Sequence, residues 1–294
     1  MEKDDPPYLA ASRDFYARIV AAAAGPLRDR LKDAFATVRR ERFLGRGPWL
    51  ARSIYEATYV QTPTDNPVHL YQNLLFALRG EQGINNGEPC LHGQLLGALN
   101  PREDSSALHI GCGTGYYTAI LAQLVGPAGK VIGYEVDAEL ASRASENLAP
   151  WPNVEVRCAS GVTDRLPRCD AIYVNAGATH PVAAWLDALN EDGRLVFPLS
   201  GTAASRAGVS LLITRRKHGF AASVVDFCLF IPCQGAFDQD EASRVTAAFR
   251  SGALWSTRSL VRDSQPDETA VLVGNGWWLS SRPVSNGSDA GSPA

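Results

Sequence analysis

The sequence predicts an α/β protein with a Rossmann-like, doubly wound and mostly parallel sheet. Three observations support this fold class. Short apolar segments alternate with helical segments between residues 106 and 200. These segments are apolar along their whole length, which is typical of strands covered by helices on both faces. A glycine-rich turn follows the first of them. We also expect an antiparallel edge hairpin, N-terminal helices and a small C-terminal extension.

The expected elements follow from periodicity and from turn residues. The parallel strands are expected at residues 107–111, 130–136, 154–159, 171–176 and 194–198, and the helices at about 115–125, 137–149 and 181–190. Right-handed crossovers would bring such strands into one sheet. The break Lys217-His218-Gly219-Phe220 separates the two strands of the edge hairpin, expected at 209–216 and 223–232.

We expect the chain to have three parts. Residues 1–100 form an N-terminal helical and cap region that contributes to the substrate pocket. Residues 101–235 form the Rossmann-like core, and residues 236–294 form a C-terminal extension. In the first part, residues 1–7 should be frayed and 9–42 helical, with a break at Gly25-Pro26. Residues 45–70 should be irregular, followed by a helix at 89–99. In the extension we expect a helix near 241–250, a strand near 269–274 and a disordered tail at 283–294.

Composition excludes several classes of partner. The net charge is -3 and the pI is near 6.0, so no basic field attracts nucleic acid. No apolar run reaches the ~18 residues that cross a bilayer. The acidic start Met1-Glu2-Lys3-Asp4-Asp5 is unlike a signal peptide, so we expect a cytoplasmic protein with no membrane partner. The six scattered cysteines form no CxxC pair and predict buried free thiols rather than a metal site.

The strongest motif runs from Gly111 to Tyr116, where a strand passes through glycines into a helix. Glycine lets the backbone turn sharply and approach a ligand closely, and the N–H groups at a helix start favour a carboxylate or a phosphate. Glu135 ends the next strand, twenty residues after Gly115, where an acid accepts hydrogen bonds from ribose hydroxyls. A glycine turn and an acid in this order predict an adenosine-containing ligand.

Two further strand ends fall at the same edge of the predicted sheet, and open α/β sheets bind ligands at that edge. S-adenosylmethionine (SAM) is the cofactor that this pattern predicts. Its expected contacts are Gly111, Cys112, Gly113, Gly115, Tyr116, Glu135, Val136, Ser160, Gly161 and Asn175. NAD is the alternative, but it prefers GxGxxG and a second nucleotide-binding half. This chain has GxGxG and a hairpin.

Leu108 through Ala122, together with Gly193–Leu199, resembles the protein L-isoaspartyl O-methyltransferase family of class I SAM-dependent methyltransferases. Val38–Phe43 is similar to that family's VPRExF segment. Tyr71-Gln72-Asn73 and Ile84–Pro89 are similar to its Y-x-D and TISQP segments. The resemblance implies a Rossmann-like fold, SAM as cofactor and methyl transfer as the reaction.

Three positions depart from the family pattern. Gly87 stands where the family has a serine that helps hold the isoaspartyl substrate, Asn73 replaces an aspartate, and Ser160 replaces an adenine-contacting acid. These departures favour a divergent member that methylates a small-molecule or peptide-derived acceptor in natural product biosynthesis, such as an indole carbon. The alternatives are isoaspartyl carboxyl O-methylation and a non-catalytic SAM-binding module.

The candidate catalytic residues are His180, Asn86 and Glu88. His180 follows the fourth strand and is a candidate general base or substrate-orienting residue. Asn86 and Glu88 lie in a glycine-flanked loop expected to cover the cofactor, although Asn-Asn-Gly is also ordinary turn chemistry. We expect structural roles for His92 and for His109, which lies in a buried strand. A pocket for a flat acceptor is the alternative to core packing for four aromatic residues, namely Trp49, Tyr55, Tyr59 and Trp185.

Overall fold

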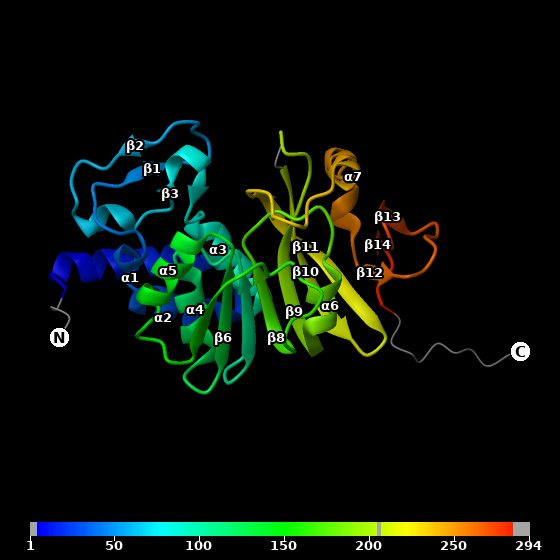
Figure 1. Ribbon diagram of the computed structural model, residues 1–294, viewed down its shortest axis with the longest axis horizontal. Coiled ribbons are helices and arrows are strands. Elements are labelled where there is room, and N and C mark those ends of the chain that lie inside the picture. The colour runs from blue at the N-terminus through cyan, green and yellow to red at the C-terminus, as the bar shows by residue number, and fades with distance from the viewer. Residues whose placement is uncertain (1–4, 205–206, 285–294) are drawn as a thin grey trace, which may run out of the picture. The chain divides into compact units, whose positions relative to one another are not determined.

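A computed structural model describes residues 5–204 and 207–284 of the chain (Figure 1). It divides into two compact units, residues 1–160 and 161–294. The tail expected to be disordered lies outside the described residues from position 285 onward. Within the described part of the chain, no helix combines the length and the apolar character that crossing a bilayer requires.

Helices form the N-terminal part of the first unit, as predicted. They are α1 (Pro7–Val20), α2 (Arg28–Thr37), α3 (Pro89–Leu99) and the short 3-10 helices η1 (Ala21–Ala23), η2 (Gly25–Leu27), η3 (Arg40–Phe43), η4 (Pro67–Leu70) and η5 (Gly80–Gln82). The expectation of a frayed start over residues 1–7 is wrong at Pro7, where α1 begins with a proline that presets its first turn, and residues 1–4 lie outside the described part of the chain. The predicted break between α1 and α2 is confirmed.

Helix α3 was predicted with its observed bounds, and glycine sets how closely it packs. A Cβ atom at Gly93 would lie 2.2 Å from the Val20 carbonyl oxygen, and one at Gly97 would lie 2.5 Å from the Ala24 Cα. Only glycine allows backbone contact at this distance. Helix α3 is therefore held against the N-terminal helices, and with it the end of the loop that leads into it.

A small antiparallel sheet in the first unit was not predicted. Its strands are β1 (Leu50–Arg52), β2 (Val60–Gln61), β3 (Leu75–Arg79) and β4 (Ile84–Asn85), in the order β2-β1-β3-β4. The expectation of an irregular segment over 45–70 is wrong at β1 and β2. These strands are too short for a periodic pattern, and a buried cluster stabilises them. The cluster contains Leu44, Trp49, Ala51, Leu70 and Phe76.

The predicted alternation of strands and helices is confirmed in the first unit. Strands β5 (Ser106–Ile110), β6 (Lys130–Glu135) and β7 (Val154–Cys158) pair in parallel in this order, with helices α4 (Tyr116–Val125) and α5 (Ala138–Asn147) between them in sequence. Strands β5 and β6 are largely buried. Strand β7 is half-buried because it is the outermost strand, so burial on both faces was a wrong expectation for it.

The second unit begins with the parallel strands β8 (Cys169–Val174) and β9 (Leu189–Ser200), joined through α6 (Ala183–Ala188). Strand β9 starts five residues before its predicted start, because the polar run Asn190-Glu191-Asp192 hides it in the sequence. The edge hairpin is confirmed as β10 (Ala207–Arg216) and β11 (Gly219–Leu229), with an irregular register between Ser210 and Leu211.

The C-terminal extension continues this sheet with antiparallel strands. It contains α7 (Gln239–Arg250), the 3-10 helix η6 (Ala253–Ser256), β12 (Ser259–Arg262), β13 (Ala270–Val273) and β14 (Trp277–Ser280). In the second unit the order is β13-β14-β12-β11-β10-β9-β8 (Figure 1). Helix α7 and strand β13 were predicted, whereas β12 and β14 were missed. The antiparallel part of the fold is therefore longer than the sequence indicated.

Candidate active site

The glycine turn between β5 and α4 is fastened to strand β6. The backbone N–H groups of Gly111 and Cys112 both donate to the Tyr134 carbonyl oxygen, at 2.9 and 3.1 Å. Gly115 has a φ of 96°, and a Cβ atom there would lie 2.7 Å from Leu148 Cδ1. No side chain is tolerated at that position, because both the backbone angle and the space exclude it.

Glu135 joins the turn to the end of β6. Its carboxylate is buried and accepts hydrogen bonds from the Gly113 N–H at 2.8 Å and the Asp137 N–H at 3.0 Å. A carboxylate oxygen can accept more than one hydrogen bond, so both oxygens retain capacity for ribose hydroxyls. The acid and the glycine turn, which the sequence placed at one site, are brought together within the first unit. This arrangement fits the adenosine part of SAM.

The other predicted cofactor-binding residues of the first unit differ in whether their side chains are exposed or buried. Val136 is 44% exposed directly after Glu135, so an apolar surface lies beside the carboxylate. The Tyr116 side chain is buried with its hydroxyl 3.3 Å from that of Tyr16, and burial raises the pKa of the Cys112 thiol. Tyr116 therefore offers a ligand only backbone groups, and the Cys112 side chain is a buried neutral thiol. Ser160 is exposed after the end of β7.

Two predicted cofactor residues belong to the second unit. Gly161 is buried, and its carbonyl oxygen accepts a hydrogen bond from Trp185 Nε1 at 2.8 Å. Trp185 is fully buried, so it belongs to the core and does not line a pocket for a flat acceptor. Asn175 is the first residue after β8 and is partly exposed.

Asn86 braces the loop before α3. Its side-chain Oδ1 accepts from the Phe76 N–H at 3.0 Å, and its own N–H donates to the Phe76 carbonyl oxygen at 3.0 Å. Asn86 is buried, and none of the residues that the structure describes pairs with its Nδ2. Asn86 therefore holds the loop against β3, and its side-chain NH₂ group remains available as a hydrogen-bond donor.

Glu88, in the same loop, is paired with one of the residues that depart from the family pattern. Its Oε1 accepts from Asn73 Nδ2 at 2.7 Å, and Asn73 Oδ1 accepts from the Cys90 N–H at 2.8 Å. Burial raises the pKa of Glu88, although the hydrogen bond from Asn73 opposes the rise. An aspartate at position 73 would place a second carboxylate against Glu88, so the asparagine and the glutamate belong together.

A second departure is also explained within the first unit. Gly87 has a φ of 75°, and a Cβ atom there would lie 2.0 Å from His92 Nε2. The His92 ring stacks on Tyr117 at a centroid distance of 3.7 Å, and burial keeps its pKa well below the ordinary value. The serine of the family motif is therefore incompatible with a neutral His92 in this position.

Arg40 has a role that sequence reasoning missed. The fully buried guanidinium donates to the carbonyl oxygens of Leu70 at 2.6 Å, Gln72 at 2.9 Å and Leu74 at 3.0 Å. It thereby fixes the segment that carries Asn73. The available signal was its place in the family-like Val38–Phe43 segment.

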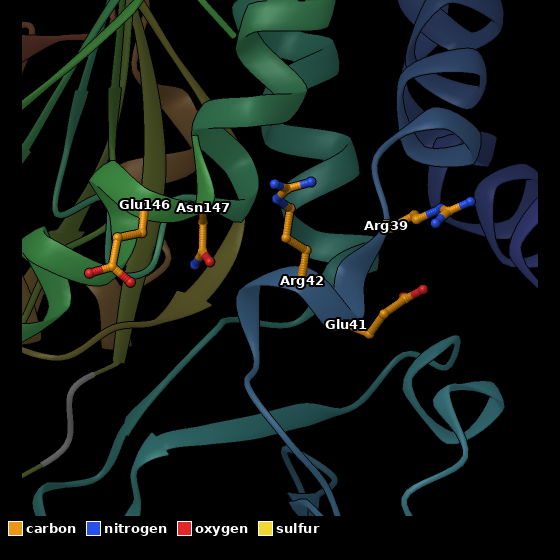
Figure 2. Close-up of a pocket in the computed structure, with 5 residues that line it drawn as sticks. All are labelled: Arg39, Glu41, Arg42, Glu146 and Asn147. Carbon is orange, nitrogen blue, oxygen red and sulfur yellow. The ribbon is translucent and has the colours of Figure 1, made fainter. Parts of the chain in front are cut away.

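A pocket of about 370 Å³ in the first unit was not predicted either. Figure 2 shows it between Glu146 and Asn147, on the α5 side, and the segment that carries Arg39, Glu41 and Arg42. Asn147 Nδ2 donates to the Thr114 carbonyl oxygen at 3.0 Å. One wall of this pocket therefore supports the glycine turn.

His180 lies in the second unit beside a residue of the C-terminal extension. Its Nδ1 is 3.2 Å from Thr179 Oγ1 and 3.4 Å from Glu241 Oε2. Both His180 and Glu241 line a pocket of about 580 Å³. Glu241 was not predicted, because nothing in the sequence links two residues this far apart. Among the described residues, no group of three His, Cys, Asp or Glu could hold a metal ion.

Residues 23–237 match the family model described as protein-L-isoaspartate(D-aspartate) O-methyltransferase. The chain is 38% identical over 143 residues to the protein-L-isoaspartate O-methyltransferase of Ectopseudomonas mendocina (strain ymp). This alignment covers 47% of this chain and 64% of that relative. The chain is 27% identical over 209 residues to the enzyme of the same name from Pyrobaculum arsenaticum, covering 69% of this chain and 91% of that one. The first match thus spans less than two thirds of the relative's length.

Two solved structures have a similar fold. A protein-L-isoaspartate O-methyltransferase superimposes with a TM-score of 0.62 at 20% identity, over 85% of this chain and 73% of that chain. The second is a Plasmodium falciparum protein described as a putative protein-L-isoaspartate O-methyltransferase, in complex with S-adenosyl-L-homocysteine. It superimposes with a TM-score of 0.53 at 18% identity, over 73% of this chain and 97% of that chain. At these identities the likeness establishes the α/β fold.

Proposed function

We propose, because the chain belongs to the protein-L-isoaspartate(D-aspartate) O-methyltransferase family, that it transfers the methyl group of SAM to the side-chain carboxylate of an isoaspartyl residue in a peptide or protein. One observation carries the cofactor half of the proposal. The Glu135 carboxylate and the Gly113 N–H lie 2.8 Å apart in a glycine turn that tolerates no side chain at Gly115. The family match and the named relatives support the acceptor.

The chain's own residues would act by binding and alignment. When bound, SAM supplies a methyl group on a cationic sulfur. Glu135 would accept hydrogen bonds from the ribose hydroxyls, and the exposed side chain of Val136 would contact the adenosine. Alignment of this kind supplies ~7–11 kcal/mol in well-oriented reactions. A carboxylate acceptor carries no proton at neutral pH, so its methylation needs no general base.

A second acceptor class is favoured by the loop before α3. Glu88 presents a carboxyl group with a raised pKa, and His92 excludes the serine of the family motif from position 87. A carboxyl group in this loop offers no positive charge to an anionic acceptor. We therefore retain as second candidate a small-molecule or peptide-derived acceptor that carries a proton, such as the indole of a tryptophan-derived metabolite.

The acceptor experiment compares three probes by mass spectrometry: an isoaspartyl peptide, the same peptide with a normal aspartate, and a tryptophan-containing cyclic dipeptide. A mass gain of one methylene unit on the isoaspartyl peptide alone supports the first candidate. A gain on the cyclic dipeptide alone contradicts it and supports the second.

The cofactor is tested separately by calorimetric titration with SAM, S-adenosylhomocysteine and NAD. We expect both adenosyl ligands to bind and NAD not to bind. Binding of SAM without methylation of any of the three probes would favour a non-catalytic SAM-binding module. Binding of NAD alone would refute methyl transfer.

A further inference from the structure

The end of strand β3 lies against the glycine turn of the first unit. A Cβ atom at Gly113 would be 3.5 Å from Leu78 Cδ1, which is the distance of an ordinary van der Waals contact. The β3–β4 pairing is irregular next to this contact: Ala77 pairs with Asn85, and the residue two positions later pairs with Ile84. Leu78 is therefore the extra residue of a β-bulge, a feature that redirects a side chain. Here the redirected side chain meets the glycine turn.

Arg79, the next residue, ties the same strand end to the start of helix α5. Its Nη2 donates to Asp137 Oδ1 at 3.0 Å and to Glu139 Oε2 at 2.7 Å. The Arg79 side chain is 27% exposed, and among the described residues these two carboxylates are the only hydrogen-bond partners of its guanidinium. Two neighbouring residues of β3 thus reach two segments of the chain that are distant from β3 in sequence.

Asp137 connects the Arg79 contact to Glu135, the acid expected to bind ribose. The Asp137 side chain caps α5 by accepting the N–H groups of Glu139 and Leu140, both at 3.0 Å. Its backbone N–H donates to Glu135 Oε1 at 3.0 Å. The Leu140 N–H and the Arg79 charge hold the pKa of Asp137 below its ordinary value, so the carboxylate is ionised. Asp137 is therefore fixed between the guanidinium and the acid.

We propose that Arg79 is a positioning residue of the cofactor site, which fastens the end of β3 to the start of α5 and thereby retains a bound S-adenosyl ligand. The fastened strand end keeps Leu78 on the glycine turn, and the fastened helix start keeps the Asp137 N–H on Glu135. The hydrogen bonds of Arg79 go to neither the turn nor Glu135, so it acts through the residues that it holds. The inference rests on the proposed function, because this site is the one expected to bind SAM.

The ion pairs of Arg79 oppose one motion in particular. Whenever the end of β3 moves away from α5, both hydrogen bonds of the guanidinium have to break. Opening of a covering segment is a common step in ligand release, so these bonds slow the escape of a bound ligand. They do not slow its entry, because Arg79 lies outside the residues expected to contact it. The effect of Arg79 therefore falls on dissociation.

Dissociation of S-adenosylhomocysteine tests this role without any methyl acceptor. In surface plasmon resonance with the full chain immobilised, we expect Arg79→Gln to release this ligand roughly 3- to 10-fold faster, because partly exposed ion pairs make a modest contribution. The association rate should stay within about twofold of the wild type. Arg79→Lys keeps the charge and should restore part of the retention. Glu139→Gln leaves β3 and the cap of α5 intact and should show a smaller increase in the dissociation rate.

The matched control is Arg18→Gln, which removes the same charge from an exposed ion pair with Asp14 on α1. We expect this variant to release S-adenosylhomocysteine at the wild-type rate. Equal dissociation rates for Arg79→Gln and Arg18→Gln would overturn the proposal. A slower association with unchanged dissociation in Arg79→Gln would overturn it as well, because the residue would then act on ligand entry.

A double-mutant cycle measures whether Arg79 acts through Asp137. Asp137→Asn keeps the side-chain cap of α5, since asparagine is as good an N-cap as aspartate, but removes the charge that faces the guanidinium. If the two residues act through their contact, the double variant releases the ligand no faster than the faster single variant. Rate increases that multiply in the double variant would show independent effects and would refute this route.

Hydrogen exchange of the ligand-free chain gives a readout that does not depend on SAM. Arg79→Gln should speed amide exchange within residues 78–86 and leave exchange in the buried strand β9 unchanged. Unchanged exchange in 78–86 would refute the hold on the strand end. If the wild-type chain binds neither SAM nor S-adenosylhomocysteine, the inference fails together with the proposed function. If it binds both and Arg79→Gln releases them at the wild-type rate, only the role of Arg79 fails.

Discussion

At the residue scale, the Glu135 carboxylate is expected to accept hydrogen bonds from the protein backbone and from the ligand at the same time. Its two oxygens accept the N–H groups of Gly113 and Asp137, which would otherwise be left without partners at the strand end. The same oxygens are the expected partners of the ribose hydroxyls. A side chain with only one accepting oxygen cannot do both, so this position should be intolerant even of a close isostere.

Replacing Glu135 by glutamine tests that requirement. Hydrogen bonds to a charged group contribute about 1.5–3 kcal/mol each, so we expect Glu135→Gln to bind SAM roughly 10- to 100-fold more weakly in calorimetry. The exposed Glu81→Gln is the control for loss of one charge in the same unit and should bind normally. Unchanged affinity in Glu135→Gln would contradict the assigned role.

Gly87 and His92 form a second residue-scale pair. A serine at 87 meets both a positive φ and the His92 ring, so Gly87→Ser should destabilise the protein by about 2–4 kcal/mol. His92→Ala should remove the steric part of this cost. In a double-mutant cycle measured by urea unfolding, we expect the coupling energy to exceed about 0.5 kcal/mol, the scatter seen for independent sites. Additive effects would show that the two positions do not interact.

At the scale of elements, the loop before α3 is held from three directions. Arg40 in η3 fixes the segment 70–74, Asn86 joins the loop to β3, and the Asn73–Glu88 pair joins segment 70–74 to the start of α3. The conformation of the loop before α3 therefore depends on contacts between elements that are distant in sequence.

The Arg40 contacts give a prediction at this scale. Arg40→Met fills similar space but leaves three carbonyl oxygens without the donors they have in the wild type. Leaving a buried neutral acceptor unsatisfied costs about 1–3 kcal/mol. We expect a lower Tm and faster proteolysis within residues 70–90. The exposed Arg46→Met serves as control. Equal Tm values for the two variants would show that Arg40 does not hold the segment.

At the scale of the whole molecule, buried histidines make stability depend on pH. His109 is fully buried, its Nδ1 is 2.8 Å from Thr118 Oγ1, and burial lowers its pKa to about 3. The unfolded chain binds a proton at this residue below about pH 6.5, and the folded chain does not until about pH 3. Stability is therefore lost as the pH falls through this window.

This single group contributes a slope of up to about 1.4 kcal/mol per pH unit. We expect His109→Gln to flatten the dependence of the unfolding free energy on pH between 7 and 5, as measured by urea unfolding at each pH. The exposed His218→Gln should keep the wild-type slope. If His109→Gln also kept it, the folded state would have to bind the proton at His109 as readily as the unfolded state does.

The sequence pattern and the related proteins indicate different methyl acceptors. The departures at Gly87, Asn73 and Ser160 favoured a small-molecule or peptide-derived acceptor. The family match and the named relatives favour the isoaspartyl acceptor instead. Within the first unit, Gly87 and Asn73 have partners in His92 and Glu88 that explain them sterically and electrostatically, so neither substitution by itself identifies the acceptor.

The sequence by itself determined the order of buried strands and helices, the edge hairpin, the glycine turn and the acid at Glu135, because each of these leaves a local pattern of apolar runs or turn residues. Only the tertiary structure decided the sheet of β1 to β4, the strands β12 and β14, the hydrogen bonds of Arg40 and the contact between Glu241 and His180. Short strands are stabilised by their neighbours rather than by their own pattern. A contact between residues far apart in the chain depends on how the chain packs, and no local spacing encodes it.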